Sequence, residues 1–179
     1  MRFLFGLAAL TLAACASPMS ATTTTTLAAA DAATALAVGQ QIAMSVTAPA
    51  AAPTDGSDAL ILMHLTHPDG RVLAFAEANH TPYDVMAQAP GGALAQVMGL
   101  FGEESPTLYQ ARSGEHEGAP FICGAEGPNY LGLYRAADGS VQIVGLNQGF
   151  EFETLSDGSQ SALPYSPDQV CARLSFNAG

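Results

Sequence analysis

The chain of 179 residues carries 16 Asp or Glu and 5 Lys or Arg, which gives a formal net charge of −11 at pH 7. Because binding to phosphate backbones depends on Lys and Arg, this balance excludes nucleic acid as a partner. All five basic residues are arginines, so a lysine Schiff base and a P-loop lysine are excluded as well. The chain has no Trp, which removes the commonest large platform for stacking sugars or bases.

The first residues have the pattern of an export signal. Arg2 is followed by an apolar run from Phe3 to Ala14. This run is about a dozen residues long, whereas a membrane-spanning helix needs roughly twenty. The pattern therefore predicts a signal peptide over residues 1–14 rather than a membrane anchor.

The segment Leu12-Ala13-Ala14-Cys15 resembles the bacterial lipobox, and this resemblance covers only the first 16 residues. It implies cleavage before Cys15, a diacylglycerol on its thiol and an acyl chain such as palmitate on its amine. Because Ala16 stands where Asp usually marks inner-membrane retention, it also implies the outer membrane, with the domain in the periplasm or outside. Two alternatives remain at this stage, which are ordinary secretion through the A-x-A site Ala14-Cys15-Ala16 and an uncleaved hydrophobic N-terminus.

Residues 15–36 combine the cysteine with a stretch made almost entirely of Ala, Thr and Ser. Such a stretch buries little apolar surface to offset the entropy of ordering, so it is predicted to be a tether. Alanine propensity makes a helix over Leu27 to Leu36 an option. The folded domain is predicted to span residues 37–179.

Three segments of the domain show strand and hairpin patterns. Ile42, Met44 and Val46 alternate with smaller or polar residues, which indicates a half-buried strand. The turn sequence at residues 67–71, His-Pro-Asp-Gly-Arg, lies between apolar runs and predicts a hairpin. A second Asp-Gly turn at residues 138–139 predicts another hairpin.

Short helices and strands are expected between and after these hairpins. Thr81-Pro82-Tyr83-Asp84 has a helix-capping pattern, and residues 93–101 form a second helix with one apolar face. The residues expected on that face are Leu94, Val97, Met98 and Phe101. Short strands are predicted at residues 107–112, 121–123 and 150–153.

The C-terminal element leaves two readings open. Ser166-Pro167-Asp168-Gln169 has capping-box spacing and favours a helix, whereas the alternation after it suits a strand equally well. The fold class predicted from these elements is a single α+β domain. It has a mainly antiparallel sheet of about six strands, two or three short helices on one face, and one disulfide.

Two cysteines remain after lipidation, Cys123 and Cys171. An even pair in an exported protein predicts a disulfide, and two buried free thiols are the alternative. Closing a loop of roughly fifty residues contributes about 4 kcal/mol in the loop-entropy account. The pair lacks the C-x-x-C spacing of redox and zinc sites.

The four histidines are the natural candidates for metal ligands. His64 and His67 lie on opposite faces of a strand and His80 precedes a helix, so all three are expected to be structural or surface residues. The segment Glu115-His116-Glu117 is a weak metal candidate that would need a further ligand such as His80 or Glu103. A solvated acidic loop is the alternative for this segment.

No nucleophile motif such as G-x-S-x-G or S-x-x-K occurs in the chain. The sequence therefore predicts a lipid-anchored cell-envelope lipoprotein that acts as a non-enzymatic binding or structural module without a cofactor. Its expected partners are the membrane, through the lipid, and a basic protein or an envelope component. The alternative is a metal-dependent envelope protein, hydrolytic in character, that uses Glu115, His116 and Glu117.

Overall fold

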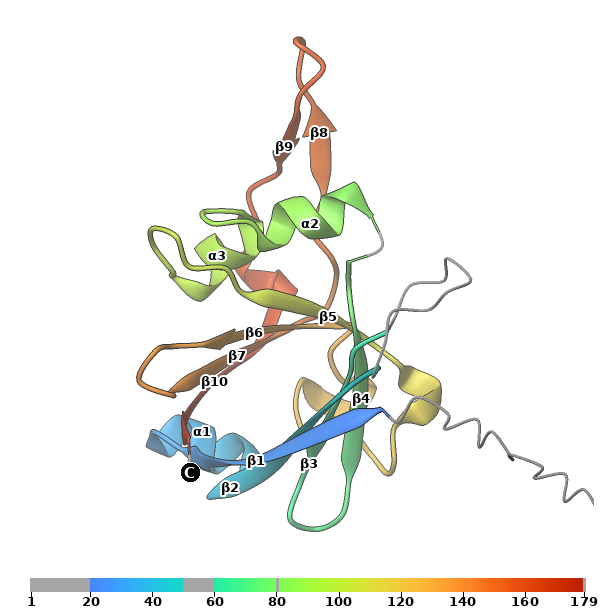
Figure 1. Ribbon diagram of the computed structural model, residues 1–179, viewed down its shortest axis with the longest axis vertical. Helices are drawn as coiled ribbons and strands as arrows, with labels where there is room; N and C mark the ends of the chain where they lie inside the picture. Colours follow the sequence, from blue (N-terminus) through green and yellow to red (C-terminus); the bar gives the residue numbers. More distant parts are fainter. Residues whose placement is uncertain (1–19, 50–59, 80, 179) are drawn as a thin grey trace, which may run out of the picture.

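The computed structural model describes residues 20–49, 60–79 and 81–178. Eight of its strands have the bounds β1 Ala21–Ala29, β2 Gln41–Ala48, β3 Leu62–Thr66, β4 Val72–Glu77, β5 Thr107–Ala111, β6 Tyr130–Arg135, β7 Val141–Leu146 and β10 Val170–Ala178. They form a closed barrel in the order β1-β10-β7-β6-β5-β4-β3-β2, and every neighbouring pair is antiparallel (Figure 1). The prediction of a mainly antiparallel fold is confirmed. The predicted sheet of about six strands has eight, and it closes into a barrel because β10 pairs with both β7 and β1.

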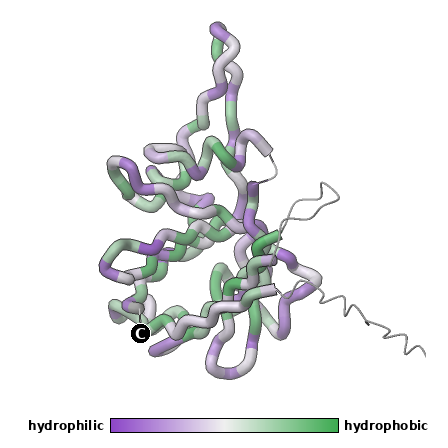
Figure 2. The backbone as a smooth tube through the Cα atoms, in the orientation of Figure 1, coloured by the Kyte–Doolittle hydropathy of each residue, from purple (hydrophilic) through white to green (hydrophobic). Residues whose placement is uncertain are grey.

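The barrel interior is filled with apolar side chains. Ile42 and Met44 of β2 are buried as their alternation predicted, and Leu73 and Phe75 of β4 join them in the same cluster. Burying a side chain of this size contributes about 1.5–3 kcal/mol. Figure 2 shows apolar stretches along the barrel strands, which agrees with a core enclosed by the sheet.

Two short helices cover the outside of the barrel. They are α2, Pro82–Gln88, and α3, Ala93–Met98. The capping box predicted at Thr81 is confirmed, with the Asp84 N–H donating to Thr81 Oγ1 at 3.1 Å. Together with outward residues of β5 and β7, α3 builds a second apolar cluster. It lies so close to the sheet that a Cβ on Gly132 would come within 2.5 Å of Leu94 Cδ1.

The apolar face predicted for the second helix is only partly right. Leu94, Val97 and Met98 are buried, but Phe101 is 85 % exposed. The helix ends at Met98 because Gly99 adopts a left-handed conformation, with φ 71°, and closes the helix. Phe101 therefore lies beyond the helix and does not share its face.

The tether predicted over residues 15–36 is wrong from Ala21 onward. Residues 21–29 form β1, which pairs with β2 along eight positions from Ala21↔Ala48 to Ala28↔Gln41. Threonine is β-branched and favours strands, and the buried Leu27 anchors β1 in the core. A helix does follow, but α1 spans Ala32–Val38 rather than residues 27–36. The folded domain therefore begins well before residue 37.

Both predicted hairpins are confirmed. β3 and β4 pair across the turn at residues 67–71, and β6 and β7 pair across the Asp138-Gly139 turn. In the second turn the Ser140 N–H donates to Asp138 Oδ1 at 2.9 Å, which is the local bond expected of Asp there. The strand predicted at residues 107–112 is present as β5. The one predicted at residues 121–123 is wrong, because this segment lies in the loop that leads to Cys123.

The C-terminal helix prediction is wrong, and the strand alternative describes the structure. The capping box at Ser166 forms, yet it opens only the single 3₁₀ turn η3, Pro167–Gln169. The strand β10 then buries Leu174 and Phe176 in the barrel. Before it, β8, Phe152–Thr154, and β9, Gln160–Ala162, make a separate hairpin that projects from the barrel (Figure 1).

The predicted disulfide between Cys123 and Cys171 is confirmed, with a Cα–Cα distance of 5.0 Å. It ties the loop after β5 to β10. Gly145 of β7 lies beneath it, and a Cβ at this position would come within 2.6 Å of Cys123 Sγ. The sheet therefore needs a glycine where the disulfide packs against it.

The predicted signal peptide and Cys15 lie outside the described residues. Within the residues that are described, no helix is long and apolar enough to cross a membrane.

Candidate functional site

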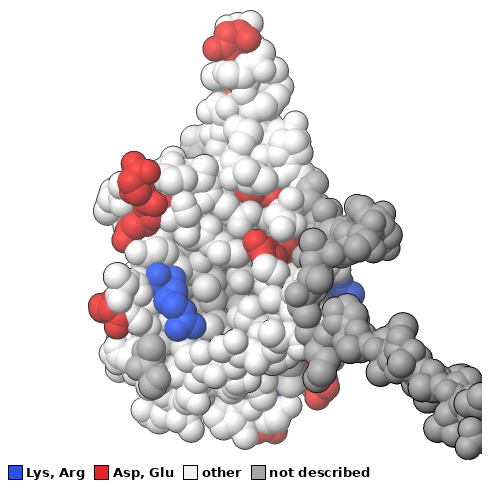
Figure 3. Space-filling view, viewed as in Figure 1, with Lys and Arg blue, Asp and Glu red and all other residues white. Residues whose placement is uncertain are grey.

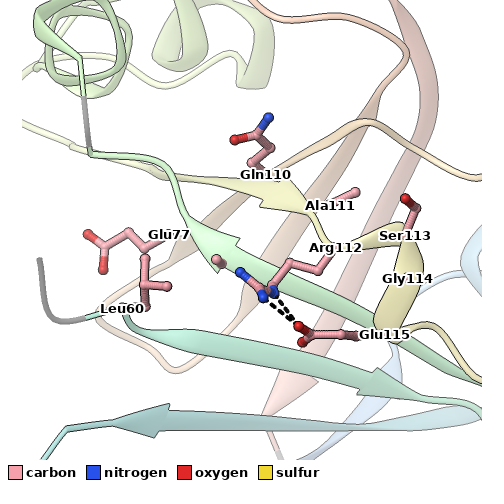
Figure 4. Close-up of a pocket in the computed structure, with 9 residues that line it drawn as sticks. Leu60, Glu77, Gln110, Ala111, Arg112, Ser113, Gly114 and Glu115 are labelled. Atoms are coloured by element: carbon pink, nitrogen blue, oxygen red, sulfur yellow. Dashed lines mark hydrogen bonds and ion pairs between the residues drawn. The ribbon is translucent and has the colours of Figure 1, made fainter.

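A surface pocket of about 510 Å³ lies beside the strands β4 and β5 (Figure 4). Ala76 and Gln110 are cross-strand partners, and they face outward because Phe75, the neighbour of Ala76, points into the core. The lining residues are Leu60, Ala76, Glu77, Gln110, Ala111, Arg112, Ser113, Gly114 and Glu115.

One side of the pocket is formed by the residues that follow β5, where the chain turns away from the sheet after Arg112. The Arg112 N–H still donates to Ala74 O at 2.9 Å, as in a regular ladder. The Arg112 carbonyl instead accepts from the Glu115 N–H at 2.8 Å and closes the 3₁₀ turn η1, Ser113–Glu115. Pairing resumes after the turn, where Glu117 and Val72 exchange two hydrogen bonds of 2.9 Å.

His116 supplies the hydrogen-bond acceptor that the β4–β5 ladder loses at this turn. Because the Arg112 carbonyl is taken, the Ala74 N–H needs another acceptor, and it donates to His116 Nδ1 at 2.9 Å. The imidazole ring of His116 is half-buried, and this burial lowers the pKa of His116 below its usual value. Because Nδ1 accepts this hydrogen bond, the proton of the neutral ring lies on Nε2.

This arrangement does not assemble the metal site considered for Glu115, His116 and Glu117. With Nδ1 accepting a hydrogen bond and Nε2 protonated, the ring of His116 has no lone pair left for a metal. Glu115 is paired with Arg112, and Glu117 serves the ladder through its backbone. Across residues 20–49, 60–79 and 81–178, no three His, Cys, Asp or Glu side chains are grouped to hold a metal ion. His80, a further ligand that the predicted site would need, lies outside these ranges.

Arg112 and Glu115 form an ion pair at the pocket, drawn as dashed lines in Figure 4. Arg112 Nε donates to Glu115 Oε1 at 2.8 Å, and Nη2 donates to the same oxygen. These hydrogen bonds lower the pKa of Glu115, so its carboxylate stays charged. Among the described residues that line the pocket, Arg112 is the only cationic one, and it is paired with Glu115.

Glu77, at the end of β4, adds a second carboxylate. Its cross-strand partner is Tyr109. Burial, and secondarily the charge of Glu77, raise the pKa of Tyr109 to about 12. The lining residues that the structure describes thus include two carboxylates and one guanidinium.

His64 and His67 occupy the structural positions expected for them. His64 lies opposite Ala74 across the β3–β4 pair. His67 lies in the hairpin turn, where its Nδ1 is 2.8 Å from Asp69 Oδ1 and its ring centroid is 5.2 Å from that of Phe121.

Sequence reasoning singled out Glu115 but missed Glu77 and Arg112. Glu77 ends the apolar run of β4 and Arg112 directly follows β5, but these strands are antiparallel, so their ends point in opposite directions. The two residues lie at one pocket because β4 and β5 pair only from Phe75↔Ala111 to Glu77↔Tyr109, and this short pairing has no signal in the sequence.

No protein-family model matches the chain, and no curated protein or solved structure matches it either. The function therefore has to be argued from the residues themselves.

Proposed function

We propose that this protein is a non-enzymatic binding module of the bacterial cell envelope, held on a membrane by lipid at Cys15. Its pocket beside β4 and β5 takes a cationic group of a basic partner. The observation that carries this proposal is the charge of the described lining residues, which include the carboxylates of Glu77 and Glu115 and the guanidinium of Arg112.

The anchor rests on the lipobox resemblance at Leu12-Ala13-Ala14-Cys15. The disulfide between Cys123 and Cys171 supports an oxidising compartment, since disulfides are rare in the cytosol. A single acyl chain binds a bilayer only marginally, whereas two or three chains on Cys15 give stable attachment. With Ala16 after the cysteine, the outer membrane is the proposed location.

A basic partner fits both the pocket and the whole surface. The chain has a net charge of −11, and acidic groups occur at several separate places on the face shown in Figure 3. Such a surface attracts a basic protein over distances comparable with the Debye length. The side chains of Gln110 and Ser113 at the pocket offer hydrogen bonds to an arginine or lysine that approaches Glu77.

The lining does not favour catalysis. Within the described part of the chain, the lining contains one hydroxyl nucleophile, Ser113, and neither a histidine nor a cysteine. A serine needs an adjacent base to become a useful nucleophile. Binding is therefore the simpler use of this pocket.

The test is the affinity for a basic lysozyme, chosen as a well-behaved basic protein, at low and at high salt. Glu77→Gln removes the charge and keeps the shape, and Glu153→Gln in the projecting hairpin is the matched control. We expect salt-sensitive binding that Glu77→Gln weakens about two- to fivefold, the range for one exposed charge pair, and that the control leaves nearly unchanged. Absence of binding at low salt, or an equal loss in both variants, would contradict the proposal.

A further inference from the structure

A hollow of about 320 Å³ lies on the outer face of the barrel, beside the hairpin turn that joins β3 to β4. Ile42 of β2 is buried in the core, so its neighbour Ala43 points outward. Ala43 lies opposite Thr26 of β1 on one side and opposite Thr66 of β3 on the other. Because the small side chain of Ala43 stands between two larger ones, the outer face is recessed at the centre of this row.

Three polar side chains border this hollow, namely the hydroxyls of Thr26 and Thr66 and the amide of Gln41. In the part of the chain that the structure describes, none of the three makes a side-chain hydrogen bond to another residue. Hydroxyl and side-chain amide groups can both donate and accept hydrogen bonds. These groups therefore match a ligand whose own polar groups also do both.

The hollow carries little charge. Among the described residues, no Asp, Glu, Lys or Arg lines it, and His67 holds its Nδ1 2.8 Å from Asp69 Oδ1. The two charged residues of the turn pair with each other, with Arg71 Nε 2.8 Å from Asp69 Oδ2. An ionised ligand would lose water here without gaining an opposite charge, and an apolar ligand would leave the hydroxyls unpaired. The lining therefore favours a neutral ligand that carries hydroxyl groups.

We propose that this hollow binds a neutral carbohydrate, with one sugar ring over Ala43. Neighbouring strands lie about 4.8 Å apart, so the backbones of Thr26 and Thr66 are about 10 Å apart, which accommodates one six-membered ring with a hydrogen bond on each side. Gln41 binds a further hydroxyl, and Ala43 and the ring of Pro68 contact the C–H groups of the sugar.

These apolar contacts are smaller than those of a Trp, which the chain lacks, so the affinity for a single sugar is expected to be in the millimolar range. The site lies at the end of β3, whereas the pocket that contains Glu77 lies at its start. Carbohydrate binding therefore does not depend on the proposed binding of a cationic group.

The test is titration of the full chain, in a detergent without sugar head groups, with the methyl glycosides of N-acetylglucosamine, glucose and galactose. Amide NMR shifts at Thr26, Gln41 and Thr66 are expected to saturate with at least one of them and to be insensitive to salt, because the ligand is uncharged. Thr26→Val and Thr66→Val each remove one hydroxyl at nearly constant shape and should weaken binding about three- to tenfold. Ala43→Leu fills the hollow and should abolish binding.

Thr24→Val is the matched control, because Thr24 faces outward on the same strand but does not line the hollow, and this variant should bind like the wild type. Thermal unfolding of each variant reports whether the barrel remains folded. Absence of saturable shifts with all three glycosides, or shifts confined to other residues, would overturn the proposal. So would an equal loss of affinity in Thr24→Val and Thr66→Val, or unchanged binding by Ala43→Leu.

Discussion

The backbone N–H of Ala74 donates a hydrogen bond to Nδ1 of His116 at 2.9 Å, across 42 residues of sequence. His116 Nδ1 takes the place of the Arg112 carbonyl as the hydrogen-bond acceptor. That carbonyl accepts from Glu115 in the turn η1 and is no longer part of the β4–β5 ladder. The hydrogen bond between Ala74 and His116 therefore joins the wall of the candidate pocket to the barrel.

Replacing His116 tests this structural role. His116→Ala leaves the Ala74 N–H without its acceptor, and we expect the free energy of unfolding to fall by about 1–3 kcal/mol. His116→Asn, whose Oδ1 can take the position of Nδ1, should recover part of that loss. Urea unfolding measures both variants, and Glu117→Ala, which removes an exposed side chain, is the control. Equal stability of His116→Ala and wild type would show that the hydrogen bond does not support the fold.

The structural role of His116 should also make the free energy of unfolding depend on pH. The pKa of His116 is lowered in the folded state, so above about pH 6.5 the ring is neutral in both states and stability is complete. Below that pH the unfolded chain binds the proton first, and the free energy of unfolding falls until the folded pKa is reached. Glu115, whose pKa is lowered by hydrogen bonds from Arg112, acts in a separate window, with stability lost as the pH falls below about 4.5.

Urea unfolding between pH 8 and pH 5 measures the histidine effect. His116→Asn should show a smaller decline over this range than the wild type, although its stability at pH 8 is lower. Parallel curves for the two proteins would assign the decline to other groups.

Gly145 is predicted to be the residue that lets the disulfide pack on the sheet. A methyl group there would come within 2.6 Å of Cys123 Sγ and 3.2 Å of Cys171 Sγ. Gly145→Ala should therefore lower the free energy of unfolding by about 1–3 kcal/mol, the usual cost of overpacking. Gly114→Ala, where nothing lies within 4 Å, is the control. Thermal unfolding under non-reducing conditions gives the comparison, and equal losses in the two variants would refute the packing argument.

The proposed anchor predicts a specific covalent state. The intact mass of protein extracted from its own membranes should correspond to a chain that begins at Cys15, carries acyl chains and lacks two hydrogens for the Cys123–Cys171 disulfide. Cys15→Ser should release the protein from the membrane fraction. A mature chain that begins after Ala16 without lipid would contradict the anchor.

The parts of the fold that depend on local chemistry were predictable from the sequence. The turns at Pro68-Asp69-Gly70 and Asp138-Gly139, and the cap at Thr81, are short-range signals in which each residue type satisfies a nearby backbone group. The pair of cysteines was predictable because its chemistry leaves few alternatives.

Barrel closure was not predictable, because it depends on pairing between the two ends of the domain. β1 meets β10 through only three residue pairs, and its threonines carry too little apolar area to reveal a strand by periodicity. The role of His116 in the candidate site was not predictable for a related reason. The ligand chemistry of His116 was visible in the sequence, but its role as an acceptor follows from the point at which Arg112 leaves the ladder.

The central claim, that the pocket beside β4 and β5 binds a cationic group, is tested most directly by amide NMR shifts of the full chain during titration with a short peptide containing one arginine. The account predicts saturable shifts at Gln110, Arg112 and Ser113 that weaken in Glu77→Gln. Shifts confined to other acidic places, such as the turn at Asp157, or shifts that persist unchanged in Glu77→Gln, would contradict it.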